Sequence, residues 1–472
     1  MSRERGRDNS RPKNSRPPRR RAERAKPPVE DPARTAALET LRAVRERDAY
    51  ANLVLPGMLR RHRVSGRDTA LATELAYGAC RARGLLDAVI ADCSDRPLER
   101  IDPLLLDALR LGTYQLLRTR IPGHAAVGAT VELVRTNSGS RLAGFANAVL
   151  RRVGERTEAE WVSRLAPDPD EDPVGHAAFR HAHPRWIARA FADALGGTAE
   201  LDAALAADDE RPAVHLAARP GEISADELAA VTGGDPAPYS PYGVHLEAGS
   251  GDPGQLEAVR EGFAAVQDEG SQLAALALTH PEIEGSDTRW LDLCAGPGGK
   301  ANLLGALVTL DGGTLDAVEQ AEHRAELVTS ATQGLSVTVR VADGRDFGAP
   351  DSYDRVLVDA PCTGLGALRR RPESRWRRGP EDVEELVRLQ RELLRAALTV
   401  TRPGGVVAYV VCSPHPEETT GVVNDVLRQT DARELDARAC FPGVPDLGEG
   451  PFVQLWPHRH GTDAMFCALL RV

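Results

Sequence analysis

Cysteine is scarce in this 472-residue sequence, and long apolar runs are missing. The seven cysteines include no CxxC pair, which argues against a zinc site and a disulfide scaffold and indicates a reducing compartment. No apolar run approaches the roughly 20 residues that span a bilayer, and the polar N-terminus lacks the apolar core of a signal peptide. We therefore expect a soluble cytoplasmic protein that has no metal site and does not contact a membrane.

Charge is distributed unevenly along the chain. The formal net charge is −10, yet residues 1–26 contain eleven Lys/Arg against three Asp/Glu. Such a segment has too little apolar surface to offset the entropy lost on ordering, so we predict that residues 1–30 form a disordered basic tail. A nucleic-acid-binding arm and a solubilising extension are equally compatible with this composition.

Apolar periodicity divides the remainder into three regions. From residue 31 to 155, apolar residues recur at helical spacing, as in Ala37, Leu41 and Val44, which predicts an all-α bundle. Residues 156–265 contain short strand-like segments such as AVHLAARP and YGVHLEA between Pro, Gly and Asp, which predicts a small α/β linker domain. Residues 266–472 alternate strand-like and helix-like segments and are typical of an α/β domain.

The strands of the third region are continuously apolar. They are TRWLDLC, GGTLDAVEQ, SVTVRVADG, DRVLVDAPC and GGVVAYVVCS, and the longest helix-like segment covers residues 381–400. Continuous apolar strands that alternate with helices predict a parallel sheet covered on both faces. Ligands of such sheets bind beyond the carboxyl ends of the strands, which is where the unusual residues of this region stand.

Three of these strand ends form a candidate nucleoside pocket. The first strand runs into CAGPGGK, where glycines allow close approach of the backbone and the following helix offers free N–H groups. Glu319 ends the second strand and is placed to bind ribose hydroxyls, while Asp343 ends the third and suits an adenine amino group. The pattern fits NAD and S-adenosylmethionine, although the AGPGG loop favours S-adenosylmethionine.

Cys362 and Cys412 directly follow the fourth and fifth strands. The tetrapeptide that ends in Cys362 is DAPC rather than [DN]PP[YFW], which disfavours methylation of an amino group. Carbon-5 of a pyrimidine becomes nucleophilic only after a group adds to carbon-6, and a thiolate suits that addition. With the two strands as neighbours, one cysteine would make the bond and the other would help to break it. The alternative is that both are buried strand-end residues without chemistry.

An arginine-rich run, RRRPESRWRR, covers residues 369–378. Arginine pairs with phosphate and tryptophan stacks on unpaired bases, so the run predicts a clamp for single-stranded or loop RNA. The alternative is a solvated charge run. The residues assigned to this RNA clamp are Arg369, Arg370, Arg371, Arg375, Trp376 and Arg377.

Three motifs, LDLCAGPGGK, VLVDAPCTGLGALRRRPESRW and VAYVVCSPHPEE, resemble the RNA cytosine-5 methyltransferases that have two active-site cysteines. The helical region with GFANAVLRR resembles the RsmB-type (Sun/Fmu) branch, in which a NusB-like RNA-binding domain precedes a Rossmann-like class I methyltransferase domain. The resemblance implies transfer of a methyl group from S-adenosylmethionine to carbon-5 of a cytosine in 16S ribosomal RNA. It extends the expected RNA contacts to residues 31–155 and 156–265, and we expect a monomer.

The resemblance also assigns roles to individual residues. Cys412 is implied as the nucleophile that attacks carbon-6 and Cys362 as the residue that assists release, with Asp359 or Lys300 also at the cytosine. The implied cofactor-binding residues are Cys294, Ala295, Gly296, Pro297, Gly298, Gly299, Lys300, Glu319, Asp343 and Asp359.

Three positions depart from the family's pattern. Gly296 stands where alanine is frequent, Glu319 where aspartate is common, and Val411 where threonine often precedes the nucleophile. None of these departures removes a reacting group. Two further interpretations are compatible with the sequence: methylation of another RNA, such as tRNA or 23S rRNA, and a non-catalytic NusB-like RNA-binding or transcription factor.

Overall fold

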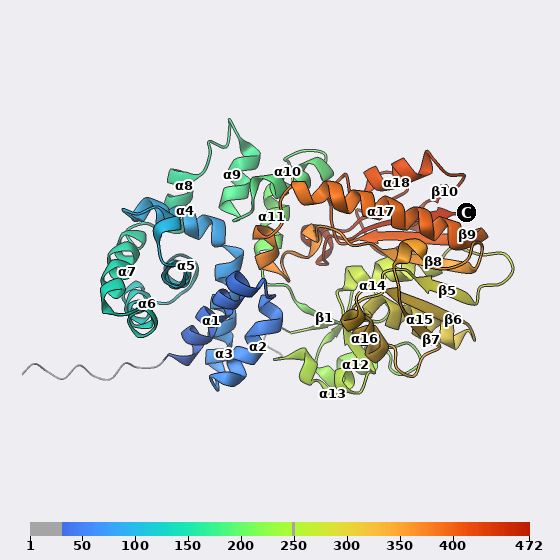
Figure 1. Cartoon of the computed structure of the whole chain (residues 1–472), viewed down its shortest axis with the longest axis horizontal. Helices are drawn as coiled ribbons and strands as arrows, with labels where there is room; N and C mark the ends of the chain where they lie inside the picture. The colour runs from blue at the N-terminus through green and yellow to red at the C-terminus, as the bar shows by residue number, and fades with distance from the viewer. Residues whose placement is uncertain (1–30, 248–250) are drawn as a thin grey trace, which may run out of the picture. The chain divides into compact units, whose positions relative to one another are not determined.

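Helices dominate the first half of the chain and a large sheet dominates the second (Figure 1). The structure is a computed structural model that describes residues 31–247 and 251–472. The prediction of a basic tail falls on residues 1–30, outside these described residues. Within the described ranges, no helix has both the length and the apolar character required to cross a bilayer.

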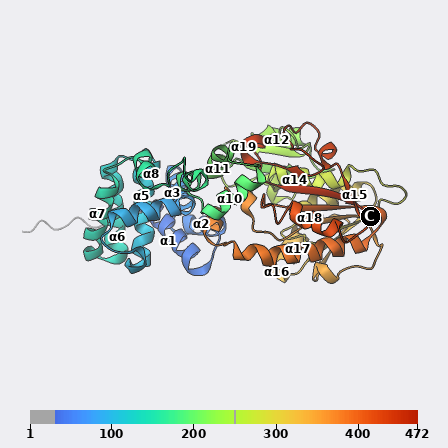
Figure 2. The same ribbon diagram turned by 90° about the horizontal axis from the view of Figure 1, so that it is seen from above.

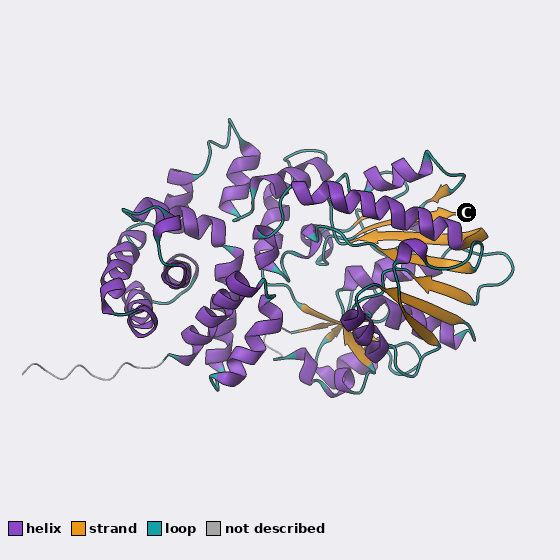
Figure 3. Cartoon of the chain, viewed as in Figure 1, coloured by secondary structure: helices purple, strands orange, loops and turns teal. Residues whose placement is uncertain are grey.

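Residues 31–155 fold into a helical bundle around one apolar core, as the apolar spacing predicts (Figure 3). Asp102 begins helix α5 by accepting hydrogen bonds from the N–H groups of Leu104 and Leu105, and Pro103 occupies the first helical position. Helix α5 in turn packs against most of the other helices of the bundle. The helices are α1 (Pro32–Arg47), α2 (Ala51–Arg61), α3 (Arg67–Arg81), α4 (Arg83–Cys93), α5 (Pro103–Arg118), α6 (Gly123–Ser138) and α7 (Ser140–Val153).

The second region differs from its prediction in its first half. Four helices precede the strands: α8 (Glu158–Leu165), α9 (Pro173–Arg180), α10 (Arg185–Ala194) and α11 (Leu201–Asp209). The apolar side chains of α9, α10 and α11 pack against Leu365 and Trp456, far along the chain, so their burial was not visible in the local sequence. The predicted strands are present in an antiparallel sheet of order β2-β3-β1-β4. Its elements are β1 (Val214–Ala218), α12 (Ala225–Thr232), β2 (Asp235–Pro236), β3 (Gly243–Leu246), α13 (Glu257–Arg260) and β4 (Ala264–Val266).

A mixed sheet of order β10-β12-β9-β8-β5-β6-β7 organises the third region. Its strands β7, β6, β5, β8 and β9 are parallel, as predicted. Two further strands were not predicted from the sequence: β12, which runs antiparallel to β9, and β10, which runs antiparallel to β12. The elements are α14 (Glu269–Leu276), β5 (Arg289–Asp292), α15 (Gly299–Leu310), β6 (Thr314–Glu319), α16 (Glu322–Ala331), β7 (Val337–Val341), β8 (Tyr353–Asp359), α17 (Glu381–Val400), β9 (Thr401–Val411), α18 (Thr420–Leu427), β10 (Arg433–Leu435), β11 (Val453–Gln454), α19 (Pro457–His460) and β12 (Phe466–Arg471).

Helices cover both faces of this sheet. Neighbouring strand residues point to opposite faces, so Ala408 and Val410 join α14 and α15 in one core while Val407 and Tyr409 join α17 and α18 in another. The long helix α17 runs beside the sheet in both views (Figure 1, Figure 2) and has the bounds that the sequence predicts. The sheet is thereby buried on both faces, and its strand ends are left as the place for a ligand.

The arginine-rich run contacts the other two regions of the chain. Arg375 is fully buried, where its Nη1 lies 3.2 Å from Oδ1 of Asp209 and its Nη2 donates to the carbonyl of Asp208 at 2.7 Å. Trp376 donates from Nε1 to the carbonyl of Cys80 at 2.9 Å. These contacts attach the run to α11 and α3.

Trp376 also fills a gap in the bundle. Gly84 is the second residue of helix α4 and lies next to the tryptophan ring, and a Cβ added to Gly84 would lie 2.3 Å from that ring. Only a residue without a side chain leaves room for so close an approach. The indole therefore serves packing between two regions.

Arg369 and Arg370 form a buried cluster with two aspartates. Arg369 Nε lies 2.7 Å from Oδ1 of Asp463, and Arg370 Nη2 lies 2.7 Å from Oδ1 of Asp268. Buried charges of this kind are stabilised by their partners and are not available to solvent. The guanidinium groups of Arg369, Arg370 and Arg375 bind partners inside the protein, which argues against their predicted role in an RNA clamp. For Trp376 the indole N–H is used in the same way, and the RNA contact of its ring stays a prediction.

Replacement of Arg375 by alanine should destabilise the protein. Asp209 would keep its ion pair with Arg118, but the buried Asp208 carboxylate would lose its contact with the guanidinium, and breaking a buried ion pair typically costs about 3–5 kcal/mol. The free energy of unfolding, measured by urea denaturation, should fall by about that amount. Arg378→Ala is the matched control, because Arg378 belongs to the same run but is exposed. Equal stability of the two variants would contradict the structural role of Arg375.

Candidate active site

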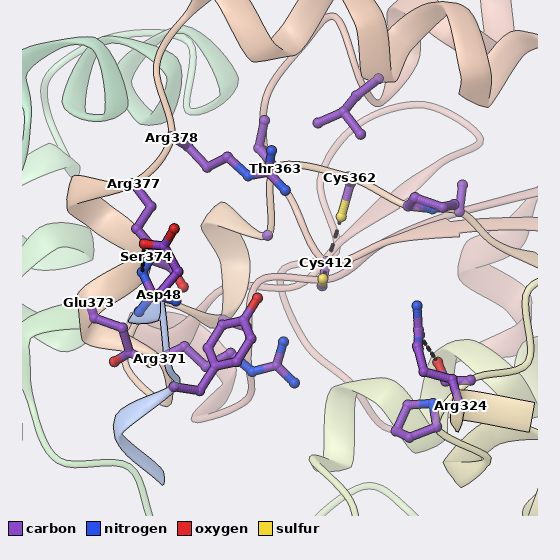
Figure 4. Close-up of a pocket in the computed structure, with 18 of the residues that line it drawn as sticks. Asp48, Arg324, Cys362, Thr363, Arg371, Glu373, Ser374, Arg377, Arg378 and Cys412 are labelled. Atoms are coloured by element: carbon purple, nitrogen blue, oxygen red, sulfur yellow. Dashed lines mark hydrogen bonds and ion pairs between the residues drawn. The ribbon is translucent and has the colours of Figure 1, made fainter. Parts of the chain in front are cut away.

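A cavity of about 1010 Å³ lies beyond the carboxyl ends of β5, β6, β8 and β9 (Figure 4). Residues that follow these strands line one side, and residues of the helical bundle, among them Asp48 and Tyr50, line another. Cys362 and Cys412 both lie in its wall. The sheet edge singled out by the sequence thus opens onto a cavity with room for a nucleoside cofactor beside a nucleobase.

Cys362 and Cys412 face each other with their sulfur atoms 3.4 Å apart (Figure 4). The parallel pairing of β8 with β9 causes this closeness, because Asp359, the last residue of β8, lies opposite Val410, and β9 ends one residue later. The hydrogen bond from Cys362 lowers the pKa of the Cys412 thiol. The same hydrogen bond, together with burial, raises the pKa of Cys362. Cys412 is therefore the sulfur that ionises more readily.

A charged pair lies in the same part of the site. Lys300 Nζ is 2.8 Å from Oδ2 of Asp359, and Asp359 lines the cavity. Burial opposes the charged form of Lys300, but the Asp359 carboxylate outweighs this effect and raises the pKa of the ammonium. The charge of Lys300 also adds to the Cys362 hydrogen bond in lowering the pKa of Cys412. The cavity wall thus offers an anionic acceptor in Asp359, and the buried Lys300 ammonium lies beside that acceptor.

The glycine-rich loop between β5 and α15 forms another part of the cavity. Gly298 has a φ of 112°, a left-handed conformation, and a Cβ added to it would lie 2.8 Å from Ala331. Gly296 donates its N–H to Oε2 of Glu319 at 3.2 Å, which ties the loop to the end of β6. The loop is therefore packed closely against α16 and β6, and Cys294, Gly296 and Pro297 are its residues that line the cavity.

Asp343 completes this part of the wall. Its carboxylate lies 2.6 Å from Arg345 Nη2, and this guanidinium holds the pKa of Asp343 below its usual range. These groups suit a nucleoside cofactor: the glycine-rich loop and the N-terminus of α15 offer backbone N–H donors, and carboxylates at the ends of β6 and β7 offer acceptors. Of the predicted cofactor-binding residues, the cavity is lined by Cys294, Gly296, Pro297, Glu319, Asp343 and Asp359, but not by Ala295, Gly298, Gly299 or Lys300.

Comparison with known proteins places the chain in a family. Residues 279–471 match the family described as 16S rRNA methyltransferase RsmB/F, and residues 31–155 match the NusB family. The chain is 60% identical over 456 residues to MT1451 of Mycobacterium tuberculosis (strain CDC 1551 / Oshkosh), whose name describes it as a methyltransferase, with 96% of this chain and 99% of that protein covered. This chain belongs to the RsmB/F methyltransferase family.

Other comparisons agree with membership of the RsmB/F family. Ribosomal RNA small subunit methyltransferase B of Vibrio vulnificus (strain YJ016) is 30% identical over 447 residues, which cover 93% of this chain and 98% of that protein. The crystal structure of PH0851 aligns with a TM-score of 0.77 at 21% identity, covers 94% of this chain and 99% of that chain, and supports the fold alone. The predicted fold class is confirmed, and the chain is an S-adenosylmethionine-dependent RNA methyltransferase.

A buried carboxylate that the sequence analysis did not assign joins the two cysteine loops of this RsmB/F enzyme. Glu418 is fully buried and accepts hydrogen bonds from the N–H of Thr363 at 2.8 Å and from Oγ of Ser413 at 2.6 Å. Thr363 follows Cys362 and Ser413 follows Cys412, so one carboxylate fixes both loops. Glu418 belongs to the motif VAYVVCSPHPEE, but that motif gives no sign of its hydrogen bond to Thr363, which follows a different strand.

Two departures from the family's pattern compensate each other in space. A Cβ added to Gly296 would lie 2.2 Å from Oε2 of Glu319. The longer acid at position 319 therefore uses the space that an alanine at position 296 would fill. Glycine and glutamate at these positions form a matched pair.

Gly296→Ala should weaken binding of S-adenosylmethionine, because the added methyl group displaces the Glu319 carboxylate from the cavity wall. Gly296→Ala combined with Glu319→Asp should restore much of the affinity, because the shorter acid withdraws by one methylene group. Calorimetry on the wild type, both single variants and the double variant completes a double-mutant cycle. Losses that simply add would show that the two positions are independent.

Proposed function

We propose that this RsmB/F enzyme methylates carbon-5 of a cytosine in 16S ribosomal RNA through a covalent bond between Cys412 and carbon-6. The observation that carries the proposal is the pair of sulfur atoms 3.4 Å apart in the wall of the cavity. Methylation of an amino group needs no nucleophile, whereas methylation of carbon-5 needs one that adds first and leaves last. The name of the Vibrio vulnificus relative supports the small-subunit RNA as substrate over tRNA and 23S rRNA.

S-adenosylmethionine supplies an electrophilic methyl group when it is bound. We assign its binding to the loop of residues 294–300, with Glu319 accepting from the ribose hydroxyls and Asp343 from the adenine amine. These residues stand at the ends of β5, β6 and β7, where ligands of such sheets bind. Lys300 and Asp359 are assigned to the cytosine, because this donor and acceptor lie near both the loop and Cys412.

The reaction begins with addition of the Cys412 thiolate to carbon-6, which forms a carbon–sulfur bond. The Lys300 ammonium stabilises the electron density that the addition places on the cytosine ring. Carbon-5 would then use its electron pair to form the bond to the methyl group, whose bond to the sulfonium sulfur would break and leave S-adenosylhomocysteine. The proton on carbon-5 passes to solvent, the electron pair of its bond restores the ring double bond, and the carbon–sulfur bond breaks to return the Cys412 thiolate. Cys362, beside the departing sulfur, assists this last step.

A non-catalytic role is not favoured, because both thiols, the Lys300–Asp359 pair and the glycine-rich loop are all in place. We place the enzyme in the cytoplasm as a monomer, with residues 31–155 as an additional RNA-binding region. Support for that region comes from its match to the NusB family.

Bisulfite sequencing of ribosomal and transfer RNA from a deletion strain should identify the substrate. A cytosine of 16S rRNA protected in the parent should become convertible in the deletion and regain protection when the gene is restored. Restoration with the Cys412→Ala variant is the matched control and should leave that cytosine unprotected. Loss of protection confined to tRNA or 23S rRNA would contradict the assigned substrate.

The two cysteine variants should behave differently. Cys412→Ala cannot add to carbon-6, so it should form neither methylated product nor a covalent complex with RNA. Cys362→Ala can still add and transfer the methyl group, and it should accumulate a protein–RNA complex that survives denaturing electrophoresis. The variants differ because a trapped complex forms only when Cys412 is present to make the bond and Cys362 is absent and cannot help to break it.

Each outcome of this experiment has a definite meaning. Reversed behaviour would exchange the roles of Cys362 and Cys412. Full activity of both variants without a trapped complex would rule out the covalent mechanism. The double variant should form no complex, which controls for RNA bound at other residues.

A further inference from the structure

The loop between α1 and α2 brings a tyrosine of the helical bundle into the catalytic cavity. Tyr50 is 39% exposed and lines the same cavity as Cys412. The N–H of Ala51, next in the chain, donates to Oε1 of Glu373 at 3.1 Å, and Arg377 donates to the carbonyl of Ala49. The loop is therefore attached on both sides of Tyr50 to the segment that follows Cys362.

Two arginines of that segment lie over the tyrosine ring. The guanidinium carbons of Arg371 and Arg377 are 5.2 Å and 5.0 Å from the ring centroid, within the range of a cation–π interaction. Both arginines line the cavity, and Figure 4 shows them with Cys362 and Cys412. The aromatic ring of one region thus orients two cations of another.

Arg371 differs from the other arginines that line the cavity. Each of the others has a carboxylate within 4.0 Å, including Arg378, which lies 3.5 Å from Asp382, and Arg377, which lies 4.0 Å from the highly exposed Asp48. Among the residues that the structure describes, Arg371 is exposed and no carboxylate pairs with it. Its positive charge also contributes to lowering the pKa of Cys412, after the effects of the Cys362 hydrogen bond and Lys300, which places it within electrostatic reach of the nucleophile.

We propose that Tyr50, Arg371 and Arg377 form a phosphate-binding site for the RNA strand next to the target cytosine. The inference rests on the proposed function, because a cytosine can reach Cys412 only if its flanking phosphates enter the cavity. A guanidinium without a carboxylate is free to bind a phosphate, and the Tyr50 ring limits the directions in which Arg371 and Arg377 can point. The bundle thereby supplies part of the substrate site in addition to any RNA contacts on its own surface.

RNA affinity measured against salt concentration tests the site, with a short single-stranded cytosine-containing oligoribonucleotide as the probe. Arg371→Gln should weaken binding and reduce the slope of log affinity against log salt by about 0.7, the value for one phosphate contact on a single strand. Tyr50→Ala should weaken binding as well, whereas Tyr50→Phe should bind like the wild type because it keeps the ring. Arg433→Gln is the matched control, since Arg433 is an exposed arginine on β10 at the far edge of the sheet and should leave the slope unchanged.

Arg371 could bind either an RNA phosphate or the carboxylate of S-adenosylmethionine, and measurement of cofactor affinity distinguishes the two. Calorimetry with S-adenosylmethionine should give the wild-type affinity for Arg371→Gln. A loss of cofactor affinity with an unchanged RNA salt slope would overturn the proposal and assign Arg371 to the cofactor carboxylate. If the wild-type enzyme methylates RNA and the Arg371→Gln variant has the same salt slope as the wild type, the phosphate-binding site is overturned while the proposed function stands. Absence of cytosine methylation in the wild type would instead contradict the proposed function.

Discussion

The parallel pairing of β8 with β9 is the constraint on which the site depends. Both strands are buried on both faces, so neither can shift its register without moving apolar side chains out of two cores. The register places the strand ends together, and Cys362 and Cys412 follow from them. Glu418 then closes the arrangement by binding the residues after both cysteines, so the sulfur pair does not rely on loop geometry alone.

Arginine has two roles in the segment that follows Cys362. Where an arginine meets buried aspartates, as Arg369 meets Asp463, it joins regions of the chain. Where it meets only the ring of Tyr50, as Arg371 does among the described residues, its charge stays available to a ligand. Burial and the presence of a carboxylate decide between these roles, and a count of positive charges does not.

The sequence predicted the parts of the structure whose signal is local. Continuous apolar strands identified the five parallel strands, helical spacing gave α17 to its terminal residues, and position at a strand end identified Cys362, Cys412 and Glu319. Features that depend on distant partners were missed. The helices of residues 173–209 bury apolar side chains against Leu365 and Trp456, and β12 pairs in the antiparallel direction with β9. The burial of Arg375 depends on Asp208 and Asp209, which lie far earlier in the chain.

Gly84 bears on how this protein could change over time. The indole of Trp376 occupies the place that a side chain on Gly84 would need, and its hydrogen bond to Cys80 fixes it there. The bundle therefore cannot be exchanged freely. A chimaera that carries another NusB-like bundle must have glycine at this position, because any side chain there would occupy the space of the Trp376 indole. A side chain at position 84 would have to be matched by a smaller residue at position 376, so this one contact couples what the two regions can accept.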